Sequence, residues 1–331
     1  MNNKIIRNVV CDIEPIKSTK EQFKEYCCTE RTRISTGYTN FDISLGGGLT
    51  DELYIFGAPT STGKSAFWMS IAQNIAESDS ETSVLYFSLE MSKREFIARG
   101  TSMITYEHRL EETSSIAYTN SDILGWRCNK DTGDFEKLDY SCYEPFVDEY
   151  YQRYGDNLYI IDSEAGNLNA NRIADIASKF RYDHLEEPFV VVVDYLQIGG
   201  DADTSDRKSK TDNMVTLFKR LSAQLEIPVI CISSVARDDY KKRVSLSSFK
   251  ESGNIEYGGG ICLGWNWYGE TVAPGKGDDA MLKQFKREGW RLMELDVLKS
   301  RNGARGTRVS FKYIPAYNFF EEICDQQIFV C

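Results

Sequence analysis

The chain has 331 residues, a length that fits one large α/β domain with a short additional segment. Its 39 basic and 50 acidic side chains give a formal net charge of −11, so the surface as a whole is not that of a nucleic-acid-binding protein, and contact with DNA or RNA has to come from local basic loops. Nine cysteines without a C-x-x-C pair and two histidines argue against a zinc site and for the reduced thiols of a cytoplasmic protein. Apolar runs stay well short of the roughly 20 residues of a membrane helix, so we expect no membrane association.

The first 30 residues are polar and of mixed composition. Within them, Ser18-Thr19-Lys20-Glu21 is typical of a capping box and predicts a short helix that continues to about Cys28. Such a segment is too short to be a domain. We therefore expect residues 1–30 to be an N-terminal arm, and residues 31–331 to form one large domain.

From Arg33 onward, short apolar segments alternate with patterns typical of helices. The segments expected to be strands are 53–56, 83–88, 158–162, 189–194 and 229–234. This alternation predicts a mainly parallel, buried sheet flanked by helices. The clearest helical pattern covers 213–225, where packing against the core explains a single apolar stripe.

Beyond residue 255 the pattern changes to shorter strands. They are expected at 261–267, 292–299 and 309–313, and they predict an antiparallel extension of the sheet. A different stretch, 124–152, is acidic, rich in tyrosine and weakly periodic. Both an insertion and a partner-binding surface fit this composition; we favour the insertion, because exposed aromatic side chains can equally cap a core beside them.

A phosphate-binding loop is predicted directly after the first strand. Its residues are Ala58, Pro59, Thr60, Ser61, Thr62, Gly63, Lys64 and Ser65. The usual pattern, Gly-x-x-x-x-Gly-Lys-Ser/Thr, has glycine where this chain has Ala58, and Gly57 stands one residue upstream. In such a loop backbone N–H groups surround the phosphates, Lys64 bridges the β and γ groups and Ser65 ligates Mg²⁺, whereas the alternative is a loop that merely turns the chain. The apolar repeat that follows predicts a helix whose positive dipole end also faces the phosphates.

Two acidic residues follow expected strands, as ATP hydrolysis requires. Asp194 ends a run of four valines, which places its carboxylate at the carboxyl edge of the sheet, where it can support the metal ion. The alternative is an acid that caps the following turn. Glu90 follows the second strand and is the candidate general base that orients water. Alone, a glutamate at a strand end is usually a solvated charge.

Several strings of residues occur in the order found in one protein family. They are Ile34-Ser35-Thr36-Gly37, Phe41-Asp42, Gly46-Gly47-Gly48-Leu49, Phe87-Ser88-Leu89-Glu90-Met91-Ser92, Asp194-Tyr195-Leu196-Gln197, Ile227-Pro228-Val229, Glu251-Ser252-Gly253-Asn254-Ile255-Glu256 and Lys299-Ser300-Arg301-Asn302-Gly303. Each string alone is weak, whereas together they are specific. The chain thus resembles the C-terminal ATPase domain of DnaB-type replicative helicases, which have a RecA-like P-loop NTPase fold.

The resemblance implies a homohexameric ring that hydrolyses ATP with Mg²⁺ between subunits and moves 5′ to 3′ along single-stranded DNA in replication. It implies that Lys64 and Ser65 hold the phosphates and Mg²⁺. It also implies that Glu90 activates water and that Asp194 supports the metal.

Two further residues match a Lys-x-Arg pair of the family. The resemblance implies that Lys299 and Arg301 reach into a neighbouring subunit's site as positive charges, an effect worth ~10³ to 10⁵ in rate where an arginine finger acts. The alternative is a structural pair on one exposed face of an edge strand.

Nucleic-acid contacts are expected from loops that face the centre of the ring. The basic candidates are Arg207, Lys208, Lys210, Lys241, Lys242 and Arg243. Their contact with phosphates would be independent of sequence and sensitive to salt. The alternative is that these are ordinary solvated loops.

The chain departs from the family pattern in two places. Only about 30 residues precede the ATPase region, where family members have a separate domain that binds primase or stabilises the ring; the predicted helix before Cys28 resembles, by position, a linker helix that docks on the next subunit. Ser234 stands where the family has a glutamine that senses the γ-phosphate, which weakens the argument for processive unwinding more than that for ATP binding.

Three functions compete. A DnaB-type helicase or translocase, with primase or a loader as a further partner, predicts ATP hydrolysis stimulated by single-stranded DNA. A RecA-like recombination factor, loader or switch predicts nucleotide-dependent assembly without strand separation. A small-molecule kinase fits least well, because the strings at Ser88 and Asp194 belong to motor proteins.

Overall fold

The computed structural model describes residues 16–28, 33–78, 81–125, 127–128, 132–166, 168–185, 187–194, 207–235, 242–249, 260–267, 287–300 and 306–323. The chain divides into two units, Met1–Arg33 and Ile34–Cys331. In the first unit, a 3₁₀ turn, η1 (Ile16–Thr19), leads into helix α2 (Lys20–Cys28), as predicted for this segment. The side chains of Ile16 and Phe23 are exposed there.

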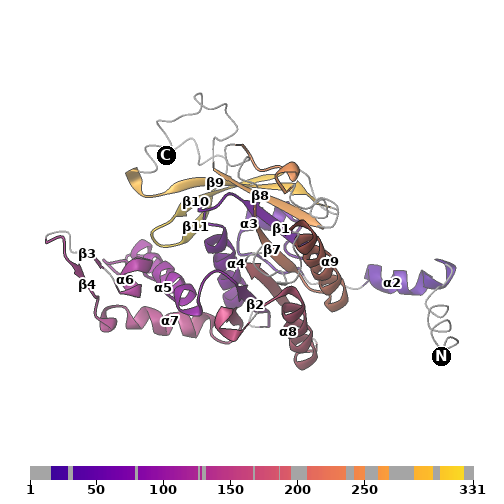
Figure 1. Cartoon of the computed structure of the whole chain (residues 1–331), viewed down its shortest axis with the longest axis horizontal. Helices are drawn as coiled ribbons and strands as arrows, with labels where there is room; N and C mark the ends of the chain where they lie inside the picture. Colours follow the sequence, from indigo (N-terminus) through magenta and orange to yellow (C-terminus); the bar gives the residue numbers. More distant parts are fainter. Residues whose placement is uncertain are drawn as a thin grey trace. The chain divides into compact units, whose positions relative to one another are not determined.

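The second unit is built on a nine-stranded sheet (Figure 1). Its strands are β1 (Leu53–Ala58), β2 (Ser83–Ser88), β5 (Leu158–Asp162), β6 (Phe189–Asp194), β7 (Val229–Ser234), β8 (Ile261–Trp267), β9 (Arg291–Lys299), β10 (Arg308–Ile314) and β11 (Phe319–Ile323). They lie in the order β11-β10-β9-β8-β1-β7-β6-β2-β5. Pairing is parallel from β5 to β8 and antiparallel from β8 to β11, which confirms the predicted architecture. Strand β11 was not predicted.

Helices cover both faces of this sheet (Figure 1). They are α3 (Thr39–Ser44), α4 (Lys64–Ser78), α5 (Lys93–Leu110), α6 (Asn120–Leu124), α7 (Glu144–Tyr154), α8 (Ala170–Asp183) and α9 (Arg207–Leu225), with the 3₁₀ turns η2 (Tyr140–Cys142), η3 (Ser163–Ala165) and η5 (Leu246–Phe249). Alternate strand residues face opposite sides: Val190 and Val192 pack in the core that holds α4, whereas Val191 and Val193 pack in the core that holds α8 and α9. Among the described residues, no helix is long and apolar enough to cross a membrane.

Helix α9 begins earlier than predicted, at Arg207 instead of residue 213. The basic residues Arg207, Lys208 and Lys210 therefore belong to the first turns of a helix and not to a loop. Arginine and lysine are good helix formers, and the apolar stripe used for the prediction starts only where the helix reaches the core.

An aromatic cluster fixes α4 on the sheet. Phe67 of α4 lies at its centre, with the ring of Trp265 stacked at 4.5 Å between centroids and the ring of Phe311 edge-on at 5.0 Å. The other rings in contact with Phe67 are Tyr38, Phe41, Phe56, Trp68 and Phe320. Because these rings come from β1, β8, β10, β11 and α3, the cluster joins both halves of the sheet to the helix.

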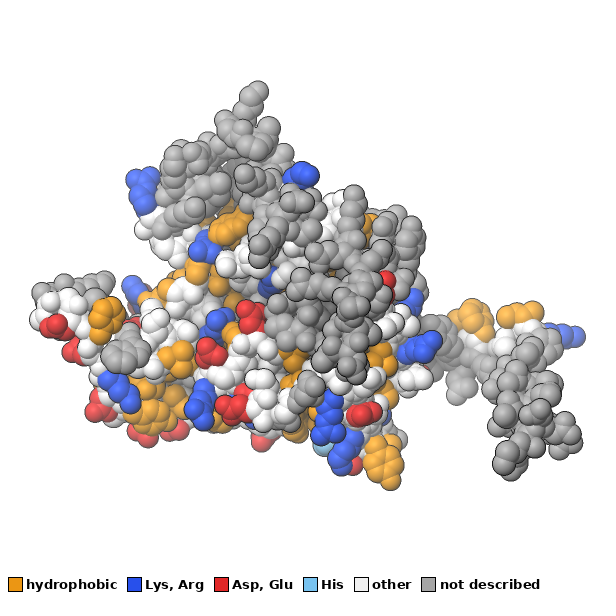
Figure 2. Space-filling view, viewed as in Figure 1, with side chains coloured by type: hydrophobic (Ala, Val, Ile, Leu, Met, Phe, Trp, Pro, Cys, Tyr) orange, Lys and Arg blue, Asp and Glu red, His pale blue; other side chains and the backbone are white. Residues whose placement is uncertain are grey.

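The tyrosine-rich stretch forms a small hairpin, β3 (Arg127–Cys128) with β4 (Phe135–Glu136), followed by η2 and α7. Tyr150 and Tyr154 of α7 are buried in a cluster with Ala76 and Ile104 of α4 and α5. These tyrosines therefore cap a core, and the assignment of the stretch 124–152 as an insertion stays a prediction. Figure 2 shows acidic, basic and hydrophobic side chains mixed over the side of the domain that carries α5 to α7.

The start of α3 is capped from the far end of the chain. Its N-cap residue, Tyr38, makes no side-chain cap, and the Glu322 carboxylate of β11 instead accepts the backbone N–H groups of Asn40 and Phe41, both at 2.9 Å. A carboxylate at this position satisfies two of the N–H groups that a helix N-terminus leaves unpaired and also favours the helix dipole.

Replacing Glu322 by alanine is expected to lower the free energy of unfolding by about 1 kcal/mol, the usual value of a lost helix cap. Chemical denaturation of the purified protein measures this. Glu321→Ala is the matched control, because this neighbouring carboxylate is exposed and pairs with Lys312 on the adjacent strand. An equal loss in both variants would contradict the capping role of Glu322.

Candidate nucleotide site

Four parallel strands end at the same edge of the sheet. The register pairs Ala58 at the end of β1 with Ser234 at the end of β7, and Ser88 at the end of β2 with Asp194 at the end of β6. The residues that follow each strand therefore meet at one edge, as in other open α/β sheets that bind ligands there.

The predicted phosphate loop joins β1 to α4 and has a tightly folded backbone. Ser61 and Gly63 have positive φ values of 61° and 86°. The Thr62 hydroxyl donates to the Pro59 carbonyl at 2.8 Å, and the indole N–H of Trp265 donates to the Thr62 carbonyl at 2.9 Å. At Gly63 a Cβ would lie 2.8 Å from the Tyr313 ring, so both the φ value and the close ring require glycine.

The alanine at the first position of the motif has a structural explanation. Ala58 is the last residue of β1, does not have a positive φ value and pairs with Ser234, so its backbone does not require glycine. The glycine is instead needed at Gly57, where a Cβ would lie 2.2 Å from the ring of Phe249.

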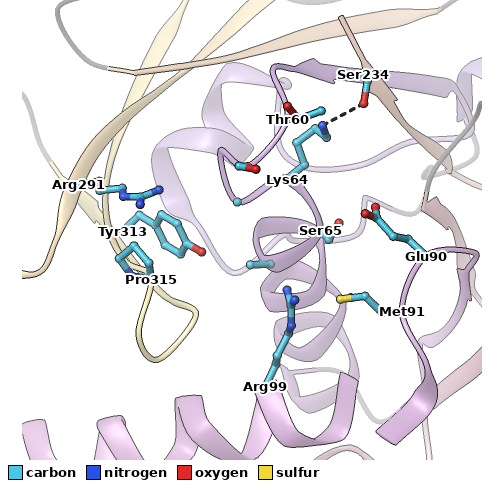
Figure 3. A pocket seen from close by; sticks show the side chains of 13 residues that line it. Thr60, Lys64, Ser65, Glu90, Met91, Arg99, Ser234, Arg291, Tyr313 and Pro315 are labelled. Carbon is cyan, nitrogen blue, oxygen red and sulfur yellow. Dashed lines mark hydrogen bonds between the residues drawn. The ribbon is translucent and has the colours of Figure 1, made fainter. Parts of the chain in front are cut away.

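Lys64 reaches back over the loop (Figure 3). Its ammonium donates to the carbonyls of Ala58 and Pro59, at 3.4 Å and 3.2 Å, and to the hydroxyl of Ser234 at 3.1 Å. Burial lowers the pKa of Lys64, while the nearby charges of Asp194 and Glu90 oppose this effect. Ser234, which stands where the family pattern has a glutamine, thus places a hydroxyl directly against the lysine of the loop.

Asp194 is almost completely buried below Ser65. The Tyr86 hydroxyl donates to its Oδ2 at 3.1 Å, whereas Oδ1 has no hydrogen-bond partner. Burial raises the pKa of Asp194 to about 6, against the opposing effects of the Ser65 and Tyr86 hydroxyls and of Lys64. A buried carboxylate oxygen without a partner fits a site for a cation. Among the described residues, no group of three or more acidic, histidine or cysteine side chains is placed to hold a metal ion by itself.

A cavity of about 410 Å³ lies over the loop, with Lys64, Ser65 and Glu90 in its lining (Figure 3). Three further side chains in the lining were not predicted: Arg99 of α5, Arg291 of β9 and Tyr313 of β10. Together with Lys64 they surround the cavity with positive charge and one aromatic face.

Those three residues differ in how far the sequence could have revealed them. Arg99 lies on the helix that Ser92 and Glu95 start with a capping box, a local signal next to Glu90 that predicts the helix but not the direction of its side chains. Arg291 and Tyr313 face each other across the antiparallel pair β9–β10. No local pattern reveals them, because they reach the cavity only through the pairing of strands far from the loop in sequence.

Of the predicted trans-acting pair, the structure describes Lys299 alone. Lys299 ends β9, which runs between β8 and β10 and is therefore not an edge strand. Lys299 is not part of the lining of the cavity described above. Arg301 lies outside the described residues. Both positions remain predictions.

The predicted nucleic-acid contacts are placed only in part. The side chains of Arg207, Lys208 and Lys210 in α9 lie outside the described residues, as does Lys241. Lys242 is exposed. Arg243, in contrast, binds the carboxylates of Glu294 and Asp296 in β9. We therefore leave Arg243 out of the contacts with nucleic acid that we propose below.

The sequence was compared with known protein families. Residues 33–322 match the family described as the DnaB-like helicase C-terminal domain. The chain belongs to this family. The DnaB-like domain is 30% identical over 297 residues to the replicative DNA helicase DnaB of Geobacillus stearothermophilus, covering 88% of this chain and 57% of that protein. It is 28% identical over 295 residues to the replicative DNA helicase DnaC of Bacillus subtilis, covering 87% of this chain and 56% of that protein. The DnaB-like domain thus spans slightly more than half the length of these relatives.

Solved structures show the same fold. One, described as an ATPase domain, superposes with a TM-score of 0.68 at 21% identity, covering 95% of this chain and all of that one. A DnaB-like replicative helicase, solved in a study of its interactions with primase, superposes with a TM-score of 0.68 at 23% identity, covering 96% of this chain and 73% of that one. The predicted RecA-like architecture of this DnaB-like domain is confirmed.

The pH dependence of stability is expected to report on Asp194. Because its pKa is raised to about 6, above the ordinary value of the unfolded chain, the folded state prefers the protonated carboxyl. In metal-free buffer this residue therefore costs stability as the pH rises through about 6, and the difference in melting temperature between Asp194→Asn and the unaltered protein should grow in favour of the variant over that range.

Thermal melts from about pH 5 to about pH 8 measure this difference. Tyr86→Phe is the matched control: it removes a hydrogen bond to the charged form of Asp194, so the transition should move to higher pH. A difference that stays constant with pH would contradict the assignment.

Proposed function

We propose that this chain binds ATP with Mg²⁺, hydrolyses it, and uses the energy to move along single-stranded DNA as a DnaB-type replicative helicase. The observation that carries the proposal is that Lys64, Ser65, Glu90 and Asp194 come from different segments of the chain and meet at one edge of the sheet, around or below one cavity. The family membership supports the same function. The direction 5′ to 3′ is part of the proposal and follows the family resemblance.

In the proposed reaction the loop backbone and Lys64 bind the phosphates of ATP. The phosphate oxygens replace the carbonyl and hydroxyl partners that Lys64 contacts in the structure, so the ammonium gains charged partners on binding. Ser65 and Asp194 would hold Mg²⁺, Asp194 with its unpartnered oxygen. The metal ion supplies charge neutralisation between the β- and γ-phosphates.

Glu90 is the proposed general base. Its carboxylate is exposed in the cavity at the end of β2, where it can accept a proton from a water molecule in line with the γ-phosphate. Arg99 lies on the same side of the cavity and provides positive charge from the same chain (Figure 3). Arg291 adds a further positive charge to the lining of the cavity, where its guanidinium lies over the ring of Trp267.

We further propose that the site is completed by a second copy of the chain in a homohexameric ring, with Lys299 and Arg301 as the residues that reach across. Lys242 and the basic start of α9 are the proposed contacts with the DNA backbone. Primase or a loading protein is the proposed further partner, on the resemblance to replicative helicases.

Steady-state ATP hydrolysis with and without single-stranded DNA tests the proposal. We expect single-stranded DNA to stimulate the rate of ATP hydrolysis several-fold, because a motor couples hydrolysis to movement along DNA. A rate that does not change with DNA would instead favour a switch or loader. Lys64→Ala should abolish nucleotide binding or turnover, and Glu90→Gln should bind ATP yet lose hydrolysis. Glu111→Gln, at the exposed C-terminal end of α5, is the control that should hydrolyse normally. Normal turnover in Glu90→Gln would show that the base lies elsewhere.

A mixing experiment tests the shared site. Arg301→Ala alone should lose turnover, and a mixture of Arg301→Ala with Glu90→Gln should regain part of it, because each subunit then supplies the group that the other lacks. Hydrolysis is measured over a range of mixing ratios, with each variant alone as the baseline. A mixture that is no more active than its components would contradict catalysis between subunits.

A further inference from the structure

Residues 242–249, which we call the strap, have contacts with three strands of the sheet, β9, β8 and β1. The backbone N–H of Val244 donates to the Asn266 side chain of β8 at 2.7 Å, and the Val244 side chain is buried against Gly264 of the same strand. At its other end the strap closes in the turn η5, where the ring of Phe249 packs against Gly57 of β1. The strap is therefore fixed at both ends to strands of the core.

Arg243 makes the strongest of these attachments. Its Nε and Nη2 donate to the two carboxylate oxygens of Asp296, at 2.6 Å and 2.7 Å, and its Nη1 donates to Glu294. Glu294 and Asp296 are two residues apart in β9 and so point to the same face. Both are nearly buried, and a two-pronged guanidinium–carboxylate pair in such a place fixes geometry as well as charge.

A second arginine binds the same two acids from outside the strap. Arg308 of β10 donates through Nε to Asp296 at 3.0 Å and lies 3.2 Å from Glu294 through Nη1. It lies opposite Asp296 in the β9–β10 pair, and its side chain is 46% exposed against 15% for Arg243. Two guanidiniums thus balance two carboxylates, and of the two arginines Arg243 is the one that belongs to the strap. Asn266 of β8 adds a neutral link, since it donates to Asp296 at 2.9 Å and accepts the backbone N–H of Val244.

The two neighbouring basic residues Lys242 and Arg243 therefore have different roles. The guanidinium of Arg243 has carboxylate partners at Nε, Nη1 and Nη2, which leaves it little capacity for a phosphate. Lys242, the preceding residue, is exposed. We propose that Arg243 is a positioning residue that holds Lys242 in place for contact with the phosphates of single-stranded nucleic acid, an inference that rests on the proposed function.

A double-mutant cycle on DNA binding tests the inference. Fluorescence anisotropy with a labelled oligothymidylate measures the affinity of the unaltered protein, Lys242→Ala, Arg243→Ala and the double variant, each over a series of salt concentrations. Each single variant is expected to bind several-fold more weakly and to lower the salt slope by about 0.7, the value of one phosphate contact on a single strand. The double variant is expected to resemble either single variant, because Arg243 acts through Lys242.

Two outcomes would overturn the inference. Additive losses, with a salt slope lowered by about 1.4 in the double variant, would mean that both residues contact phosphates independently. Unaltered binding by Arg243→Ala would mean that the strap does not position Lys242. If the unaltered protein itself fails to bind the oligonucleotide, the proposed function and this inference fall together, whereas the first two results leave the proposed function standing.

Arg308→Ala is the matched control. It removes a guanidinium from the same two carboxylates without touching the strap, so its DNA affinity is expected to stay within about twofold of the unaltered protein. A loss equal to that of Arg243→Ala would assign the effect to the unbalanced buried acids instead of to the strap. Should Arg243→Ala fail to fold, the same cycle is run with Arg243→Lys, which keeps the charge but cannot bind both carboxylates as a fork; non-additivity there supports the inference and additivity overturns it.

Discussion

The candidate site depends on one constraint, the in-register parallel pairing of β1, β7, β6 and β2. Parallel strands end together, so the residues that follow them are brought to one edge without any contact among the loops themselves. The pairs Ala58–Ser234 and Ser88–Asp194 set this register. A slip of one residue in the pairing of β7 with β1 or with β6 would turn the following side chains to the opposite face and separate the lysine of the loop from the acid beneath it.

At this edge of the sheet, Lys64 and Asp194 lie in surroundings that would suit their charged forms better with a ligand bound than without one. Burial disfavours the charged forms of both Lys64 and Asp194, which shifts their pKa values in opposite directions. In the complex proposed above, phosphate and a divalent cation would supply the missing opposite charges. The aromatic cluster at Phe67 and the indole hydrogen bond to Thr62 hold the phosphate loop rigidly. The loop therefore cannot move to expose Lys64 to water.

The sequence allowed most strands of the sheet to be predicted, because they depend on local patterns. Local patterns also singled out Lys64, Ser65, Glu90 and Asp194, whose roles stay predictions. The strands at 83–88, 158–162, 189–194, 229–234 and 261–267 have the predicted bounds, since each is a compact apolar run with clear ends. What could not be predicted depends on long-range pairing. Arg291 and Tyr313 line the cavity from the antiparallel strands β9 and β10. Strand β11 has the sequence Phe-Phe-Glu-Glu-Ile, which lacks the alternation of apolar and polar residues that predicts a strand. Lys242 and Arg243 look alike in sequence, and the bonds of Arg243 to two acids some fifty residues later cannot be predicted from any local pattern.

The carboxylate of Glu322 at the start of α3 has a consequence for how the domain is made. Asn40 of the helix and Glu322 are 282 residues apart, so in a nascent chain leaving the ribosome α3 lacks its cap until Glu322 has emerged. Phe311 and Phe320, which complete the aromatic cluster, arrive equally late. The parallel strands can collapse earlier, but part of their apolar surface stays exposed until the strands that carry Phe311 and Phe320 have been synthesised. Large α/β domains most need chaperones in this condition.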